Sequence, residues 1–387
     1  MRYIPLSVPC LKGKEKEYVL DAIQKEWVST GGSYIDIFER DIAQYLEVDH
    51  AVACQSGTAG LHLALMLSGV EKEDEVFVPT LTFIAAVNPI KYIGGHPILM
   101  DCDDTLTLDV DKLERFIENE CEYKNEQLIN KSTQRKIKAI VIVHIFGNAA
   151  NMEKLMEIAE RYNLKVIEDA TEALGSYYVE GKYKGKYLGT IGDFGVYSFN
   201  GNKIITTGGG GMIVAREKKL LEKAKYLSTQ AKDDPLFYRH EEVGYNYRMT
   251  NLQAAVGVAQ LEQLEKFIFQ KKKNYQLYKK LIADIKELEL ISFSEKIRPN
   301  YWFYSVLIKS ENAKIGKIID KLHHEGIQTR PIWGLIHKQK PYMEEQNYEI
   351  NKATYYEEHI INVPCSSTLS ENEVYFIVDT LKNTLDE

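Results

Sequence analysis

The chain has 387 residues, of which 44% are hydrophobic and 27% charged, and its 48 Lys and Arg against 56 Asp and Glu give a net charge of −8. This is the ordinary composition of a globular protein, which excludes a disordered tail, a collagen-like chain and a coiled-coil rod. The acidic balance offers no basic face for nucleic acid, and no apolar run reaches the about 20 residues of a membrane helix.

Residues 1–5 show no charged region followed by an apolar one, so we expect no signal peptide. The five cysteines are scattered, and no two of them have the spacing of metal ligands. We therefore expect no metal site and no disulfide framework. The expected protein is cytoplasmic and binds neither nucleic acid nor a membrane.

Strand and helix patterns alternate through the first half of the chain. A helix is predicted over 15–26, and the pair Gly31–Gly32 follows its end. Such alternation favours a largely parallel sheet covered by helices on both faces. Strands are then predicted at 51–54, 75–79, 96–100, 138–143 and 164–167, and helices at 61–67, 84–92 and 151–162.

The pattern changes after about residue 251. A long helix is predicted over 252–270, and the Lys-rich segment 271–280 continues it with its charged face in water. The lysines at 271–273 form either an anion-binding patch or a solvated helix face, and we favour the second interpretation.

A smaller α+β unit is predicted for the C-terminal part, from a strand over 304–308 and helices over 315–325 and 371–381. We therefore expect a large domain over residues 1–255 and a smaller C-terminal domain, with the linking long helix, over residues 256–387.

A first candidate for chemistry is the small-residue turn that contains Gly57 and Thr58. It follows a predicted strand and opens a helix, and free N–H groups at a helix N-terminus bind phosphate. A close-packed turn between a strand and a helix explains the same residues without any ligand.

A second candidate is Asp169, which follows the strand over 164–167. Ligands of parallel sheets bind at the carboxyl ends of strands, and a carboxylate that faces a pyridinium nitrogen would keep this nitrogen protonated. Asp169 would otherwise be the N-cap of a following helix, and we expect its neighbour Glu168 to face solvent or to be paired.

A third candidate is Lys203, which lies between a short strand pattern and the glycine run 208–211. A lysine that attacks an aldehyde needs a lowered pKa, and glycines leave room for a flat group beside it. A surface lysine next to a flexible hairpin is the alternative. The glycine run has neither the spacing of a nucleotide phosphate loop nor that of a dinucleotide fingerprint.

These three features occur in the order that a pyridoxal-phosphate enzyme of the aspartate-aminotransferase fold requires. The sequence resembles the DegT/DnrJ/EryC1/StrS family of sugar aminotransferases over essentially its full length. The resemblance implies an α/β PLP-dependent transferase fold, in which a large domain with a mixed, mostly parallel sheet is joined to a smaller C-terminal α+β domain. The matching stretches are 56–61, 79–83, 166–175, 192–211 and 244–252.

The same resemblance implies how the cofactor, pyridoxal 5'-phosphate, is held. Lys203 matches the Schiff-base lysine, which also carries protons between substrate and cofactor, and Asp169 matches the partner of the pyridinium nitrogen. Ser198 matches the phosphate-binding serine, together with Gly57 and Thr58. Phe83 matches the aromatic residue that stacks on the cofactor ring.

Two further matches concern the neighbouring subunit and the ring hydroxyl. Asn246 matches an asparagine that reaches the cofactor phosphate of the other subunit, which implies a homodimer with shared active sites. Glu172 stands near the ring hydroxyl, where many relatives have Gln, so its role is open. Members with His in place of Lys203 are dehydratases, and the lysine argues against that branch.

The predicted substrate also comes from resemblance. The stretch 198–208 is similar to enzymes that aminate the 4-keto carbon of nucleotide-linked 6-deoxy sugars, with L-glutamate as the usual amino donor. The stretches 4–9 and 79–88 resemble the branch that uses UDP-2-acetamido-2,6-dideoxy-4-keto-hexoses, on the way to legionaminic acid or bacillosamine. The two half-reactions would share one site and follow ping-pong kinetics.

The sequence gives weaker evidence for the residues that contact the substrate than for those that hold the cofactor. Three cationic candidates would meet the pyrophosphate, because a diphosphate in an acidic protein needs local cations. Each candidate is also explained by a structural hydrogen bond, and for His337 we favour that interpretation. Trp302 and Trp333 belong either to the core, as we favour, or to the wall of the sugar pocket. The candidates are Ser29, Thr30, Asn200, Arg248, Arg330 and His337.

Two alternatives stay open, an aminotransferase that acts on a 3-keto dTDP-sugar and a non-catalytic sensor that binds a nucleotide sugar with the same fold. The joint presence of Lys203, Asp169 and Ser198 disfavours the sensor. A scaffold or filament protein is disfavoured by the buried-strand pattern and by the absence of repeats.

Overall fold

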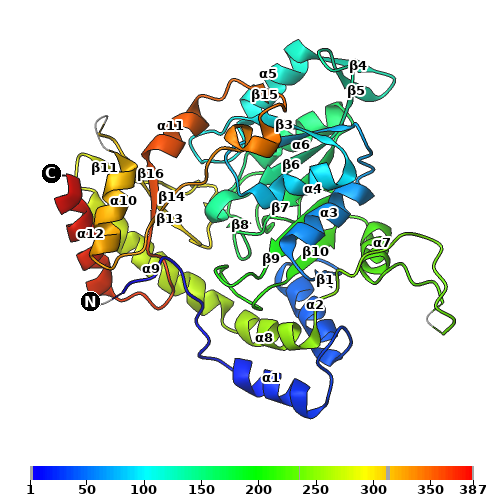
Figure 1. The fold of residues 1–387 in the computed structure, drawn as a ribbon, viewed down its shortest axis with the longest axis horizontal. Helices are drawn as coiled ribbons and strands as arrows, with labels where there is room; N and C mark the ends of the chain where they lie inside the picture. The colour runs from blue at the N-terminus through cyan, green and yellow to red at the C-terminus, as the bar shows by residue number, and fades with distance from the viewer. Residues whose placement is uncertain (1–2, 235, 311–313, 386–387) are drawn as a thin grey trace.

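The computed structural model describes residues 3–234, 236–310 and 314–385, and a large sheet lies in the middle of the molecule (Figure 1). Its strand order is β1-β10-β9-β7-β6-β2-β3-β15. β10 runs antiparallel to both of its neighbours, the other neighbours on this path are parallel, and the hairpin of β4 and β5 pairs with β6. The strands are β1 (Val52–Cys54), β2 (Glu75–Pro79), β3 (His96–Met100), β4 (Cys121–Lys124), β5 (Gln127–Asn130), β6 (Lys136–Val143), β7 (Lys165–Asp169), β9 (Phe194–Ser198), β10 (Gly211–Ala215) and β15 (Asn347–Tyr348).

The sheet separates two apolar cores, because successive side chains of a strand point to opposite faces. In β2, Phe77 packs in one core, whereas Val76 and Val78 pack in the other. Strands that are buried on both faces have continuous apolar runs, which explains why these strands were recognisable in the sequence. The helices of this part are α1 (Glu15–Gln24), α2 (Ser33–Tyr45), α3 (Gly57–Leu67), α4 (Asn88–Ile93), α5 (Val110–Glu120), α6 (Met152–Arg161), α7 (Lys218–Ser228) and α8 (Asn251–Leu261).

A four-stranded antiparallel sheet of order β11-β13-β16-β14 forms most of the C-terminal part. Helix α9 leads into it and packs against α12, and α10 also contacts α12. The elements are α9 (Leu264–Ile282), β11 (Leu288–Leu290), β13 (Tyr304–Ile308), α10 (Ile315–His324), β14 (Arg330–Pro331), α11 (Lys352–His359), β16 (Ile360–Val363) and α12 (Glu371–Leu385).

The two parts of the chain are interwoven at several points. β15 comes from the C-terminal segment and pairs with β3 of the large sheet, and β12 (Ile297–Arg298) pairs with β8 (Tyr177–Tyr178). Near the N-terminus, Ile4 forms a bridge with Ile327. The division at residue 255 stays a prediction.

The predicted strands at 75–79, 96–100 and 304–308 are confirmed, whereas the long helix predicted from 252 is two helices. The helix is interrupted between Leu261 and Leu264, where Gln263 has a φ of −111° and a ψ of −4°, outside the range of a regular helix. Helices α2, α5, α7 and α11 and the hairpin of β4 and β5 were not predicted. Their apolar positions are interspersed with charged residues.

Lys271 corrects one part of the prediction of a solvated lysine run, whereas Lys272 and Lys273 are exposed as predicted. The side chain of Lys271 is buried in α9, and its ammonium donates hydrogen bonds to the backbone carbonyl oxygens of Trp302 and Cys365. Burial lowers its pKa. The polar neighbours of Lys271 in the sequence indicated a helix face in water. In the structure, α9 packs against the four-stranded sheet and Lys271 is buried there.

Among the described residues, no helix combines the length and the apolar character needed to cross a bilayer.

Candidate active site

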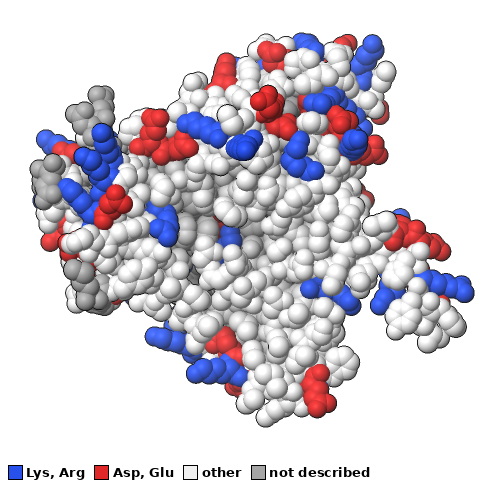
Figure 2. All heavy atoms as spheres, in the orientation of Figure 1, with Lys and Arg blue, Asp and Glu red and all other residues white. Residues whose placement is uncertain are grey.

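A cleft of ≈ 340 Å³ lies at the carboxyl ends of β7 and β9, beside the N-terminus of α3. The middle of this face of the molecule is hollowed and mostly uncharged, and charged side chains gather around it (Figure 2). Residues from the large sheet form one side of the cleft, and residues that precede β13 form the other. The lining includes Ser56, Gly57, Thr58, Thr82, Phe83, Asp169, Glu172, Ser198, Asn200, Lys203, Trp302, Phe303 and Trp333.

The N-terminus of α3 forms a cradle with the properties of a phosphate site. Ser56 caps the helix by accepting a hydrogen bond of 3.1 Å from the backbone N–H of Ala59. The first N–H groups of a helix have no partner within it, and the helix dipole favours an anion there. A Cβ on Gly57 would lie 2.9 Å from Cγ2 of Thr171 and 3.0 Å from Cβ of Ser198, so only glycine fits beside the serine.

Asp169 ends β7 in the floor of the cleft and is only 4% exposed. Its carboxylate accepts a hydrogen bond of 3.0 Å from the backbone N–H of Thr171, and the residues after it form turns. The alternative of an N-cap is therefore wrong, since no helix follows. Burial raises the pKa of Asp169, and the hydrogen bonds from Thr171 oppose this effect.

Lys203 also lies in the cleft, and its side chain is 13% exposed. Its Nζ is 3.8 Å from Oε1 of Glu172 and 4.4 Å from the ring centre of Trp302. The alternative of a surface lysine is therefore wrong. In the following glycine run, Gly208 and Gly210 have φ of +78° and +142°, which side chains disfavour.

Glu172 lies next to Lys203 and is 4% exposed. Its Oε2 accepts a hydrogen bond of 2.7 Å from the backbone N–H of Phe146. Burial raises the pKa of this carboxyl to about 7, a change that Asp169 reinforces and the ammonium of Lys203 opposes. The group therefore titrates near neutral pH.

Glu168 is fully buried and is paired, as one of the two predicted alternatives stated. Its carboxylate lies 2.8 Å from Nε2 of His144 and accepts hydrogen bonds from the backbone N–H groups of Gly189, Ile191 and Gly192. These contacts fix the end of β7 and thereby the position of Asp169.

Aromatic side chains form a wall from the mouth of the cleft to Lys203. Phe83, which is 54% exposed, lies 6.2 Å from Trp333, and Trp333 lies 5.0 Å from Phe146 between ring centres. The Trp302 indole donates a hydrogen bond of 2.7 Å to the carbonyl oxygen of Asn202. Trp302 is thus both a core residue, 2% exposed, and part of the cleft wall.

Two of the aromatic residues had no recognisable signal in the sequence. Phe146 has a φ of +56°, which is unusual for a bulky residue, and its N–H is thereby available to Glu172. Phe303 stacks on Trp302 with ring centres 4.1 Å apart. A sequence pattern does not reveal either contact, because the partners are distant in the chain.

Five of the predicted substrate residues, together with Asn246, do not line the cleft. The backbone N–H of Asn251 donates a hydrogen bond to the carbonyl oxygen of Ser29, the residue before Thr30. Nδ1 of His337 lies 2.8 Å from Oγ1 of Thr80. Asn246 and Arg248 belong to the segment between α7 and α8, and Arg330 lies on the edge strand β14. Their predicted roles stay predictions, and Asn200 is the substrate candidate that lies in the cleft.

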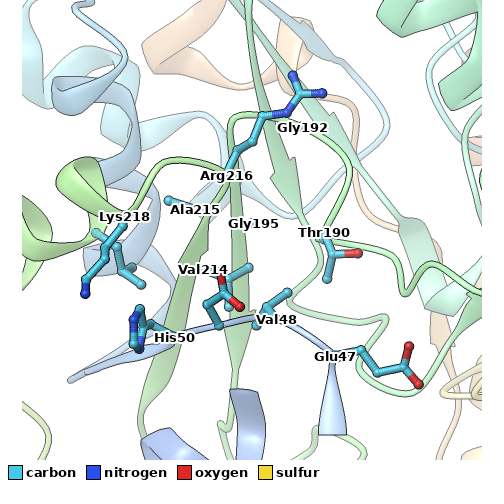
Figure 3. Close-up of a pocket in the computed structure, with 13 residues that line it drawn as sticks. Glu47, Val48, His50, Thr190, Gly192, Gly195, Val214, Ala215, Arg216 and Lys218 are labelled. Carbon is cyan, nitrogen blue, oxygen red and sulfur yellow. The ribbon is translucent and has the colours of Figure 1, made fainter. Parts of the chain in front are cut away.

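A second hollow, of ≈ 180 Å³, lies at the opposite edge of the sheet, where β9 begins and β10 ends. Figure 3 shows that the charged ends of Glu47, Arg216 and Lys218 point in different directions around it. None of the predicted site residues lines this hollow. The cleft at the carboxyl edge is therefore the candidate active site.

Comparison with known proteins agrees with this geometry. The model of the DegT/DnrJ/EryC1/StrS aminotransferase family matches residues 9–382. A GDP-perosamine synthase of Escherichia coli O157:H7 is 39% identical over 383 residues, which cover 98% of each chain. A GDP-perosamine synthase of Caulobacter vibrioides is 35% identical over 99% of this chain and 98% of its own.

A solved structure shows the same fold. The aminotransferase TlmJ from Streptoalloteichus hindustanus superposes with a TM-score of 0.89 and 24% identity, over 100% of this chain and 99% of its own. The predicted fold class, an α/β PLP-dependent transferase fold of the aspartate-aminotransferase type, is confirmed.

Proposed function

Because the chain belongs to the DegT/DnrJ/EryC1/StrS aminotransferase family, we propose that it moves an amino group from L-glutamate to the 4-keto carbon of a nucleotide-linked 6-deoxy sugar. It is a sugar aminotransferase that depends on pyridoxal phosphate. The observation that carries the proposal is the largely buried side chain of Lys203, which shares one cleft with Asp169 and the cradle at the N-terminus of α3.

The residues of the cleft fit this cofactor. The N–H groups of Gly57 and Thr58 and the hydroxyl of Ser198 would hold the phosphate, where a Cβ on Gly57 has no room. Asp169 would hold the proton on the ring nitrogen, and Phe83 would stack on the ring. When bound, pyridoxal phosphate supplies an electron sink for the carbon that loses or gains a proton.

The protein's own groups orient the reactants and move protons. Lys203 holds its amine at the cleft floor, where it would take a proton from the donor and return one to the acceptor sugar. Asp169 would place its carboxyl group next to the nitrogen of the ring. Trp302, Phe303 and Trp333 exclude water from one side of the cleft and present an apolar surface to a deoxy sugar.

The relatives favour a GDP-linked substrate. Two relatives at 39% and 35% identity over nearly the whole chain are named GDP-perosamine synthases, after a GDP-linked sugar. The UDP-2-acetamido-2,6-dideoxy-4-keto-hexose of the legionaminic acid or bacillosamine branch is the second candidate. It is supported by the two sequence stretches at 4–9 and 79–88. A 3-keto dTDP-sugar is the third.

We further propose that the protein acts as a homodimer with shared active sites. The segment between α7 and α8 projects from the body of the molecule (Figure 1) and carries Asn246 and Arg248. Exposed apolar side chains on it would be covered by a second copy of the chain. They are Leu236, Phe237, Tyr238 and Val243, which are 75%, 67%, 75% and 82% exposed.

Complementation tests the shared sites. Lys203→Ala and Asn246→Ala proteins are each expected to be impaired, and mixing them under conditions of subunit exchange should restore activity above the sum of the two. Heterodimers would contain one site with an intact Lys203 and an intact Asn246. Absence of any gain, with exchange verified by differently tagged subunits, would exclude the shared site.

A visible absorption spectrum of the purified protein tests the activity. We expect a yellow band that disappears when glutamate is added, followed by transfer of ¹⁵N from labelled glutamate to the keto sugar. Parallel assays with GDP-linked and UDP-linked 4-keto sugars, and with a 3-keto dTDP-sugar, separate the candidates. A protein that stays colourless when pyridoxal phosphate is supplied would favour the sensor instead.

A further inference from the structure

The ammonium of Lys203 lies between two very different groups. On one side, Oε1 of Glu172 is 3.8 Å from Nζ, and on the other the indole of Trp302 lies 4.4 Å from it. Both the carboxyl and the lysine are largely withdrawn from water, with side-chain exposures of 4% and 13%. A buried pair of opposite charges at this distance is strongly coupled, so a proton on one partner depends on the other.

The two oxygens of Glu172 have separate tasks. Oε2 is held by the backbone N–H of Phe146 at 2.7 Å, and Phe146 adopts a left-handed φ of +56° at this point. Among the described residues, the polar neighbour of Oε1 is Nζ of Lys203. The carboxyl is therefore fixed in place with one oxygen directed to the lysine.

The other charged groups around Glu172 favour its protonated form. Asp169, at the end of β7, adds a negative charge nearby, and burial acts in the same direction, so that the pKa of Glu172 lies at about 7. His144, at the end of β6, faces Glu168, with which it is paired at 2.8 Å. Lys203 is the cation that opposes protonation of Glu172.

We propose that Glu172 and Lys203 share one proton in the cofactor-free protein, and that Glu172 accepts the proton which Lys203 must lose before it captures pyridoxal phosphate. The N–H bond of the ammonium breaks and an O–H bond forms at Oε1. The neutral amine then has a free electron pair for the aldehyde carbon, and the aldehyde oxygen leaves as water. This inference rests on the proposed function and assigns Glu172 a role in it.

The sharing has a measurable consequence for pH dependence. Above the pKa of Glu172 the pair holds one proton, so the fraction of neutral amine no longer changes with pH. With Glu172→Gln the proton has no acceptor at this side chain and must leave to water, so the neutral fraction rises about tenfold per pH unit. The glutamine keeps an oxygen for the N–H of Phe146, so the packing is retained.

The experiment measures the rate at which cofactor-free protein captures pyridoxal phosphate, from about pH 6 to about pH 9. Protonation of pyridoxal phosphate itself affects both proteins equally, so its effect cancels in the ratio of the wild-type rate to the E172Q rate. We expect this ratio to be constant below about pH 7 and to fall about tenfold per unit above it. Glu75→Gln is the matched control, because Glu75 is also a buried carboxyl, 1% exposed, at the opposite end of β2 from the cleft. Its ratio should not vary with pH.

A pH-independent ratio for E172Q would overturn the inference and leave Glu172 as a structural acceptor for Phe146. Failure of the wild-type protein to capture pyridoxal phosphate at any pH would overturn the proposed function instead. Competitive acetylation of Lys203, read by mass spectrometry against the exposed Lys16, needs no variant. The acetylation rate of Lys203 itself is expected to level off above about pH 7, and a rate that rises in parallel with that of Lys16 would contradict the shared proton.

Discussion

The floor of the cleft and the projecting segment between α7 and α8 are organised in opposite ways. In the floor, Asp169 and Glu172 are each 4% exposed and held by hydrogen bonds from the same chain. In the segment, Phe237 is 67% exposed and Tyr238 is 75% exposed. One chain thus completes the chemistry of the floor by itself, whereas the segment presents apolar area that water does not favour. The difference indicates that the floor is ordered within one chain, whereas the segment leaves apolar side chains uncovered by its own chain.

The largest effect is expected at the cleft floor with Lys203→Arg. The guanidinium keeps the charge near Glu172 but cannot act as a nucleophile at accessible pH, so amino transfer should fall by about a thousandfold or more. The yellow band should be absent, and thermal unfolding should change little. Residual activity within tenfold of wild type would show that the floor does not carry the chemistry.

A smaller loss is expected for Asp169→Asn, about a hundredfold in kcat, because a neutral amide no longer holds the positive charge of a protonated ring nitrogen. The protein should still bind the cofactor and show its band. Asp193→Asn is the matched control, since this carboxylate accepts the N–H of Val166 at the other end of β7. Equal losses in both variants would indicate a stability effect only.

Gly57→Ala tests whether the cradle is closed to any side chain. The added Cβ would meet Thr171 at 2.9 Å and Ser198 at 3.0 Å, and overpacking of this kind costs about 1–3 kcal/mol. We expect cofactor affinity to fall about ten- to hundredfold, measured by titration of the cofactor-free protein. Gly201→Ala, which faces open space, should leave the affinity unchanged.

The smallest effect on folding is expected in the projecting segment. Phe237→Ser should change the free energy of unfolding of the isolated chain by no more than about 0.5 kcal/mol, because an exposed side chain contributes little. It should weaken the dimer, measured by light scattering over a dilution series. An unchanged dimer would show that this apolar surface lies outside the interface and would remove the proposed reason for its exposure.

Local sequence patterns were sufficient to predict the parallel strands of the large sheet. β2 and β3 were predicted with their observed bounds, because both are apolar runs buried on two faces. Amphipathic elements with many charges, such as α5 and the hairpin of β4 and β5, escaped recognition. The buried Lys271 was placed in water, since its hydrogen bonds to Trp302 and Cys365 join residues far apart in the chain.

The sequence by itself determined the family and the chain order of the cradle, Asp169, Ser198 and Lys203, because each follows a strand end or a glycine turn. Only the tertiary structure decided that Glu172 faces Lys203 and that Trp302 covers it. The physical reason is distance along the chain. Helix and strand periodicity specifies which way a side chain points from its own element, but contacts between elements depend on how the sheet, α9 and β13 pack together.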